Sequence, residues 1–131
     1  MTAGLLHICG YGARIDCMGS CIASPRIAET HTGIVFLVGD RAYKVKKPVV
    51  TDFLDFSTVE SREDACGREL VLNRRLAPDS YLGIAHFIAS GGYSEPVIVM
   101  RRHPDNLRLA TMVRRGEAVD DQLALVALVL A

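Results

Sequence analysis

The sequence predicts one α+β domain built on antiparallel strands, and three local patterns carry that prediction. A β-branched and aromatic run at 33–38 is followed by a turn and by the alternating stretch RAYKVKK at 41–47. A longer segment at 58–77 has the loose periodicity of a helix. A second pair of strand-like stretches, joined by two glycines, comes after it. Strand pairs with a helix between them are typical of the α+β class.

Length and charge exclude several kinds of protein. The chain has 131 residues, with 15 basic and 15 acidic side chains, so its formal net charge is zero. That balance gives no indication of a nucleic-acid or anionic-membrane partner. The apolar C-terminal stretch LALVALVLA is far shorter than the ~20 residues of a membrane span. Without a secretory signal at its N-terminus, the sequence predicts a cytoplasmic protein.

The chain has four cysteines: Cys9, Cys17, Cys21 and Cys66. The first three are spaced C-x7-C-x3-C, whereas structural zinc sites prefer tighter pairs repeated further along the chain. We therefore favour free thiols in a reducing compartment, and we predict no metal site. A small metal-binding protein that also uses His7 and His31 stays open as an alternative.

The first 25 residues predict no regular element. They are rich in Gly, Cys and Ser and follow neither helical nor strand periodicity. Gly10 and Gly12 are present, but no complete G-x-G-x-x-G and no P-loop lysine follow them. We interpret residues 1–27 as an irregular leader.

The strongest local prediction is a β-hairpin over residues 33–47. Gly39 and Asp40 form a two-residue turn that tolerates positive φ, and Pro48 ends the returning strand. Strand alternation then places Ala42, Lys44 and Lys46 on one face and Tyr43, Val45 and Lys47 on the other. On a solvent-facing strand these lysines would discourage edge-to-edge pairing. On a cleft-facing strand Lys44 would present a positive charge to an anion, and strand geometry alone favours neither interpretation.

The long helix is predicted from a start signal and an apolar stripe. Ser57 and Glu60 have the spacing of a capping box, so we expect the helix at 58–77, ended by Pro78. The stripe comprises Val59, Cys66, Leu70, Leu72 and Leu76. Glu69 lies beside it, and the simplest interpretation of this residue is an exposed helix glutamate.

The C-terminal third predicts two strands and then two helices. GIAHFIAS and EPVIVMRR flank the glycine pair, and DNLRLATMVRRGE forms a short amphipathic helix that stops at Gly116. Asp120 or Asp121 caps a last helix that is almost purely apolar. Such a helix is expected to be buried, yet the sequence ends before it supplies a partner, which indicates a truncated domain.

Three stretches carry a resemblance to a known family. ETHTGIVFLVGDRAYKVKKPV, FLDFSTVESRE and RELVLNRRLAPDSYLG resemble a bacterial family of predicted aminoglycoside-phosphotransferase-type kinases. The resemblance covers about residues 28–131. It implies a protein-kinase-like N-terminal lobe at 28–103, with an antiparallel sheet and one long helix. Residues 104–131 would then be the hinge exit and the first helices of a truncated C-terminal lobe.

The same resemblance implies a nucleotide site. Lys44 takes the place of the lysine that contacts the ATP α- and β-phosphates, and Glu69 that of the helix glutamate that pairs with it. Met100 would line the adenine pocket, and the backbone near Arg101 and Arg102 would hydrogen-bond the base. A cleft-facing lysine agrees with this assignment, because burial of its charge is costly unless a carboxylate and phosphates meet it.

The resemblance also implies what this sequence lacks. Phosphoryl transfer needs a catalytic-loop aspartate, a downstream asparagine and a metal-binding aspartate, and no such motif follows the hinge. Asp105 and Asn106 lie in the hinge region and cannot replace them. We therefore expect ATP as cofactor, Mg²⁺ held by ligands outside this sequence, an unidentified small-molecule acceptor and no complete catalysis. The alternatives are a non-enzymatic interaction module that docks or self-associates through its apolar end helix, and the metal-binding protein above.

Overall fold

The computed structural model describes residues 7–9, 26–88 and 91–130. Its helices are α1 (Val59–Arg74), α2 (Leu109–Arg114) and α3 (Asp120–Leu130), with a 3-10 turn η1 at Asp105–Leu107. Its strands are β1 (His7–Cys9), β2 (Arg26–Glu29), β3 (Gly33–Val38), β4 (Arg41–Lys46), β5 (Val50–Thr51), β6 (Leu54–Asp55), β7 (Tyr81–Ile88) and β8 (Ser94–Arg101).

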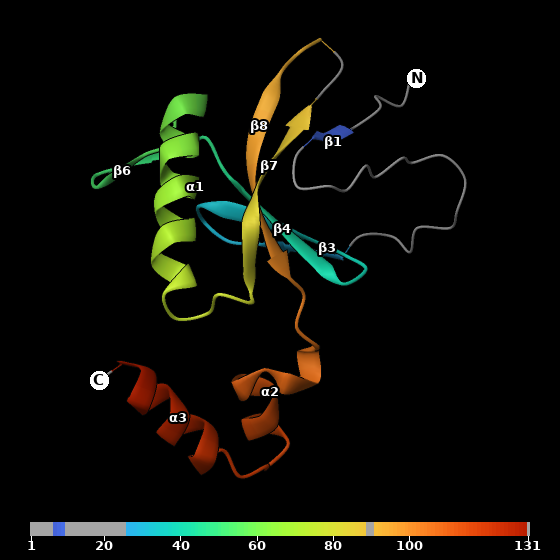
Figure 1. The fold of residues 1–131 in the computed structure, drawn as a ribbon, viewed down its shortest axis with the longest axis vertical. Coiled ribbons are helices and arrows are strands. Elements are labelled where there is room, and N and C mark those ends of the chain that lie inside the picture. Colours follow the sequence, from blue (N-terminus) through green and yellow to red (C-terminus); the bar gives the residue numbers. More distant parts are fainter. Residues whose placement is uncertain (1–6, 10–25, 89–90, 131) are drawn as a thin grey trace.

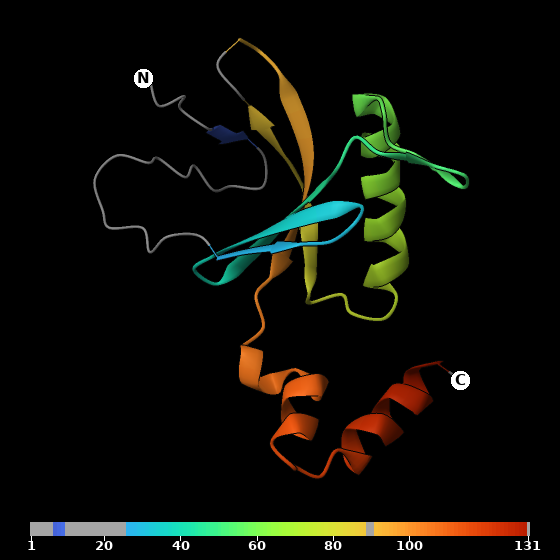
Figure 2. The ribbon, with the colours of Figure 1, turned by 180° about the vertical axis from the view of Figure 1, so that it is seen from behind.

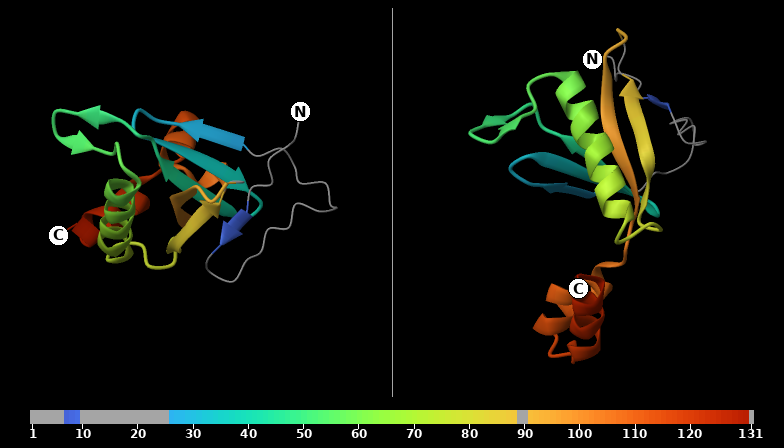
Figure 3. Two further views of the ribbon diagram at one scale, coloured as in Figure 1. Left: turned by 90° about the horizontal axis from the view of Figure 1, so that it is seen from above. Right: turned by 60° about the vertical axis from the view of Figure 1, so that its left-hand side comes forward.

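Six strands form one antiparallel sheet in the order β1-β7-β8-β4-β3-β2. Helix α1 lies along one side of this sheet, and the small β5–β6 hairpin projects beyond the helix (Figure 1; Figure 3, right). Beyond β8 the chain leaves the sheet and forms α2 and α3 as a separate group (Figure 2). The predicted α+β class is therefore confirmed.

The predicted hairpin is present as β3 and β4. Its register runs from Gly33 opposite Lys46 to Val38 opposite Arg41. Gly39 has a φ of 55°, which is a left-handed conformation that glycine adopts without the steric cost other residues incur. The second predicted pair is also present, as β7 and β8.

The helix differs from its prediction at both ends. Thr58 caps it, because the Thr58 hydroxyl accepts a hydrogen bond from the Ser61 N–H at 3.1 Å. Ser57 lies one residue before this cap, and its N–H and hydroxyl both donate to the Asp55 carboxylate. The capping box of Ser57 and Glu60 was thus the wrong choice of start. The helix ends at Arg74, before Pro78 is reached.

The predicted apolar stripe is only partly buried. Cys66 is fully buried, but Leu72 and Leu76 are 56% and 54% exposed. Arg62, a charged residue in the first turn of the helix, is buried. The prediction that the C-terminal half of the stripe is buried was therefore wrong. Polar contacts hold much of the helix to the sheet.

Two strands occur where sequence periodicity predicted none. β1 pairs with β7, and β2 pairs with β3, so the segment interpreted as an irregular leader contributes to the sheet. The rest of residues 1–25, including Gly10, Gly12, Cys17 and Cys21, lies outside the described residues. The predicted domain limits at 27 and 103 stay predictions.

Apolar residues are buried on both faces of the sheet. Tyr43, Ala85, Val97 and Val99 form one cluster, with Phe36 and Phe87 packed against it. On the other face, the register places fully buried Ile98 opposite Lys44. On this face, the charged side chain of Lys44 on β4 therefore lies beside the buried apolar side chain of Ile98 on β8.

The C-terminal helices follow the prediction more closely than α1 does. The predicted short helix begins as η1, continues as α2 and ends near Gly116, whose φ is 72°. Every described residue of α3 is exposed. Among the described residues, no helix combines the length and the apolar character needed to cross a bilayer.

Candidate functional site

The centre of the site is an ion pair between the hairpin and the long helix. Lys44 on β4 donates from Nζ to Glu69 Oε1 on α1 at 2.7 Å. The contact predicted between these two residues is therefore present. Strand alternation turns Lys44 toward the helix, and the helical rotation turns Glu69 toward the sheet.

A second lysine contacts the same carboxylate. Lys46 Nζ donates to Glu69 Oε2 at 2.7 Å, so the two lysines bind the two oxygens of one side chain. Lys46 is 8% exposed, whereas the Lys44 side chain is 31% exposed. Sequence reasoning placed both lysines on one face but gave Lys46 no role, although their spacing was the signal that could have identified it.

Electrostatics keeps Glu69 ionised. Burial raises the pKa of its carboxyl, and the hydrogen bonds and charges of Lys44 and Lys46 together lower it by more, so the net shift is downward. The Asn73 amide also donates to the Glu69 backbone carbonyl at 2.8 Å. Phe56 completes the surroundings, because the Lys46 ammonium lies 5.1 Å from the centroid of its ring.

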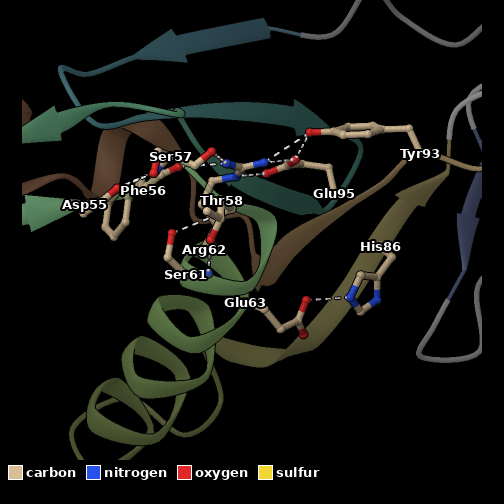
Figure 4. Close-up of polar contacts among 10 residues, drawn as sticks. All are labelled: Asp55, Phe56, Ser57, Thr58, Ser61, Arg62, Glu63, His86, Tyr93 and Glu95. Carbon is tan, nitrogen blue, oxygen red and sulfur yellow. Dashed lines mark hydrogen bonds and ion pairs between the residues drawn. The ribbon is translucent and has the colours of Figure 1, made fainter.

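A second polar cluster lies at the first turn of α1 (Figure 4). Arg62 is 3% exposed and donates from Nε and Nη2 to the two oxygens of Glu95 at 2.6 and 2.8 Å. The Tyr93 hydroxyl donates to Glu95 as well, at 2.5 Å. This cluster joins the helix to the start of β8, and nothing in the periodicity of the sequence had indicated it.

The same arginine fixes the chain that enters the helix. Arg62 Nη1 donates to the carbonyls of Phe56 at 2.8 Å and Ser57 at 3.3 Å. The hydrogen bond to Glu95 is the main reason that the pKa of Arg62 is raised. Burial raises the pKa of Glu95, but the hydrogen bonds from Arg62 and Tyr93 and the charge of Arg62 lower it by more, so the net shift is downward. Both groups are therefore charged, and the pair is a structural anchor for α1.

One more contact ties α1 to the sheet. Glu63 Oε2 lies 2.8 Å from His86 Nε2 on β7, on the more exposed side of the helix (Figure 4). At the last turn of α1, Arg74 also donates to the carbonyls of Tyr81 at 2.8 Å and Leu82 at 2.5 Å. Polar contacts centred on Glu69, Arg62, Glu63 and Arg74 thus hold one helix over the strands.

Met100 and Arg101, which the resemblance assigns to the adenine pocket together with Arg102, lie at the end of β8, and Arg102 follows the strand. Met100 is half-buried and pairs with Ala42 and Tyr81 on the neighbouring strands. The Arg101 N–H donates to the Ser80 carbonyl at 2.9 Å, and the Arg102 N–H donates to the Asp40 carbonyl at 2.9 Å. Both N–H groups therefore have partners within the protein, and a hydrogen bond between a base and the backbone near Arg101 and Arg102 stays a prediction.

A cavity of about 430 Å³ lies at the start of α1, near the Arg62 cluster. Its walls include Ile34, Val45, Pro48 and Val59, with Lys46, Lys47, Ser57, Arg62, Tyr93 and Glu95 at its polar side. Lys44, Glu69 and Met100 do not line it. The cavity therefore does not include the residues that the resemblance assigns to the nucleotide, although Lys46, which contacts Glu69, is part of its wall.

The described residues offer no cluster of three or more His, Cys, Asp or Glu side chains for a metal ion. Cys66 is a buried free thiol. Burial raises its pKa to about 11, so it is protonated near neutral pH and is a poor nucleophile. Cys17 and Cys21 fall outside the described residues.

Comparison with known proteins gives relatives without an assigned activity. No protein-family model matches the chain. Uncharacterized proteins of Mycobacterium bovis and of two Mycobacterium tuberculosis strains are each 56% identical over 121 residues, covering 86% of this chain and 24% of the relative. The chain thus spans about a quarter of the length of the curated relatives it matches.

One solved structure was also found. A crystal structure of WbdD is 17% identical to the chain, with a TM-score of 0.36, over 76% of this chain and 22% of WbdD. A TM-score of this size does not establish a shared fold.

Proposed function

We propose that this chain is the ATP-binding part of an aminoglycoside-phosphotransferase-like small-molecule kinase. The single observation that carries the proposal is the ion pair between Lys44 on the returning strand of the hairpin and Glu69 on the long helix. The order of hairpin, helix and strand pair agrees with the resemblance to this kinase family. Catalysis by this chain alone is not part of the proposal.

The exposure of Lys44 supports a role in phosphate binding. Its ammonium has three N–H donors, and one of them reaches Glu69. With the side chain 31% exposed, the others can meet phosphate oxygens without removal of the carboxylate. A lysine held in this way presents a compact positive charge to the α- and β-phosphates.

The adenine would lie near Met100, at the end of β8. Since the Arg101 and Arg102 N–H groups have partners in the protein, we place base contacts at their carbonyl oxygens or at the next N–H, that of His103. The ligands for Mg²⁺ and the groups that bind the acceptor would lie in the part of the longer protein beyond this chain. The share of the relatives that the chain covers agrees with that division.

A second candidate function follows from α3. This helix is exposed along its length and carries a continuous set of apolar side chains: Leu123, Leu125, Val126, Leu128, Val129 and Leu130. Such a surface is typical of a docking face. A non-enzymatic interaction module derived from a kinase-like fold would use this surface and leave Lys44 without a ligand.

Calorimetry with ATP and Mg²⁺ separates the two functions. We expect the unmodified chain to bind and Lys44→Met to bind at least about tenfold more weakly, because a charge-assisted hydrogen bond is lost. Lys47→Met is the matched control, since Lys47 lies on the same strand end but pairs with the exposed Glu29. Equal binding by both variants, or no binding by the unmodified chain, would exclude the nucleotide site and favour the interaction module.

A further inference from the structure

We propose that Lys46 is a positioning residue that holds Glu69 in place for Lys44. The proposal deepens the function above, because Lys44 is the residue assigned to the phosphates. Two lysines on one face of β4 bind the two oxygens of a single carboxylate, each at 2.7 Å. The ion pair between Lys44 and Glu69 can form without Lys46. The contact of Lys46 with the same carboxylate therefore requires its own explanation.

Burial distinguishes the two lysines. Lys46 is 8% exposed, and its ammonium lies over the Phe56 ring as well as against Glu69. A buried ammonium that gave up its carboxylate would leave an uncompensated charge, which is strongly unfavourable. Lys44 is more exposed and can turn toward solvent or a ligand at lower cost. Lys46 is therefore the fixed partner of Glu69, and Lys44 is the movable one.

Lys46 keeps the Glu69 carboxylate oriented when Lys44 binds an anion. If Lys44 alone bound Glu69, phosphates that attract Lys44 would compete with the only contact that orients the carboxylate. With Oε2 held by Lys46, Oε1 stays directed at Lys44 whether or not an anion is bound.

Charge balance points the same way. Two ammonium groups and one carboxylate leave one net positive charge at this place in the fold. The nearby Tyr81 hydroxyl adds no charge near pH 7, because its pKa, ordinarily 10.0, is raised further by burial. The remaining positive charge favours an anion beside the more exposed lysine, Lys44.

The first test needs no nucleotide. In protein labelled with ¹³C at glutamate carboxyls, we expect Lys46→Met to raise the titration midpoint of Glu69, because one of its two positive partners is lost. We also expect Lys44 to be acylated faster, because Glu69 is no longer fixed against it. Lys46→Arg restores the charge and most of the wild-type behaviour. Lys47→Met serves as the control and leaves both readouts unchanged, because Lys47 follows the end of β4 and pairs with Glu29. Lys46→Gln carries the same comparison if Lys46→Met does not fold.

The second test measures ATP–Mg²⁺ affinity in the same variants. Lys46→Met is expected to weaken binding about tenfold, and to have no further effect when Glu69 is already changed to Gln. A folded Lys46→Met protein whose Glu69 titrates as in the wild type would overturn the positioning role. An effect on affinity that persists in Glu69→Gln would overturn it too. If the wild type binds no ATP, the proposed function fails, and the Glu69 titration still decides the role of Lys46.

Discussion

Arg62 and Glu95 meet through two hydrogen bonds, Nε to Oε1 at 2.6 Å and Nη2 to Oε2 at 2.8 Å, and so join the first turn of α1 to the start of β8. Arg62 also binds the carbonyls of Phe56 and Ser57. One buried guanidinium therefore connects three segments, and the position of Glu69 further along the same helix depends on that anchor.

Removal of Arg62 is expected to destabilise the protein strongly. Arg62→Met leaves the partly buried Glu95 without its charged partner and removes the donor to two backbone carbonyls, and breaking a buried pair costs about 3 kcal/mol or more of unfolding free energy. Arg41→Met is the matched control, because Arg41 pairs with Asp40 at the exposed hairpin turn and such pairs contribute less than about 1 kcal/mol. Urea denaturation measures both, and similar losses in the two variants would contradict the anchoring role.

Acid is expected to destabilise the protein through Glu69 and Glu95. The pKa of each carboxyl is lowered below its ordinary value of 4.5, because lysine or arginine partners outweigh the effect of burial. The unfolded state therefore binds protons first as the pH falls. The stabilisation is fully present above about pH 4.5 and is lost as the pH falls through the folded-state pKa values.

Urea denaturation at a series of pH values between about 6 and 3 tests this linkage. We expect Glu69→Gln and Glu95→Gln to be less stable than the wild type at pH 6 and to lose less of their remaining stability on acidification. A pH dependence as steep as that of the wild type in both variants would show that other groups govern acid unfolding.

Sequence patterns predicted the local elements well and the helix interface poorly. The β3–β4 hairpin was predictable because strand alternation and a glycine turn are local signals. The contact of Lys44 with Glu69 came from a family resemblance, since periodicity alone favoured an exposed glutamate. Arg62 and Glu95 were missed because the pair joins residues 33 positions apart, and a helical arginine is ordinarily exposed.

The errors in the helix have related causes. Leu72 and Leu76 fit a helical stripe, yet both side chains are exposed, and Leu76 lies beyond Arg74, the last residue of α1. Ser57 and Glu60 matched a capping motif, but Asp55 binds Ser57 first. Both errors came from tertiary or neighbouring contacts that a spacing rule does not contain.

The helix start gives a direct comparison of two adjacent residues. Thr58→Ala removes the hydroxyl that accepts from the Ser61 N–H, and we expect a loss of about 1 kcal/mol of unfolding free energy. Ser57→Ala removes only an exposed hydrogen bond to Asp55, so a smaller loss is expected. Denaturation curves of the two variants decide between them, and a larger loss for Ser57→Ala would restore Ser57 as the cap.

The apolar surface of α3 is expected to cause self-association of this chain. Burial of apolar surface contributes about 25 cal/mol per Å², so contact between exposed helices lowers the free energy of the associated form. Leu125→Gln combined with Leu128→Gln should shift sedimentation-velocity profiles toward monomer. Leu72→Gln is the control, since Leu72 is an exposed leucine on α1, away from this surface.

The same variants separate docking from nucleotide binding. Lys44 and Glu69 lie in the sheet and on α1, so we expect the α3 changes to leave ATP–Mg²⁺ affinity unaltered. A wild-type chain that sediments as a monomer at every concentration would contradict the docking surface. Equal effects of the Leu72 and α3 changes would instead assign the association to general hydrophobicity. Loss of ATP affinity in the α3 variants would mean that this helix supports the nucleotide site directly.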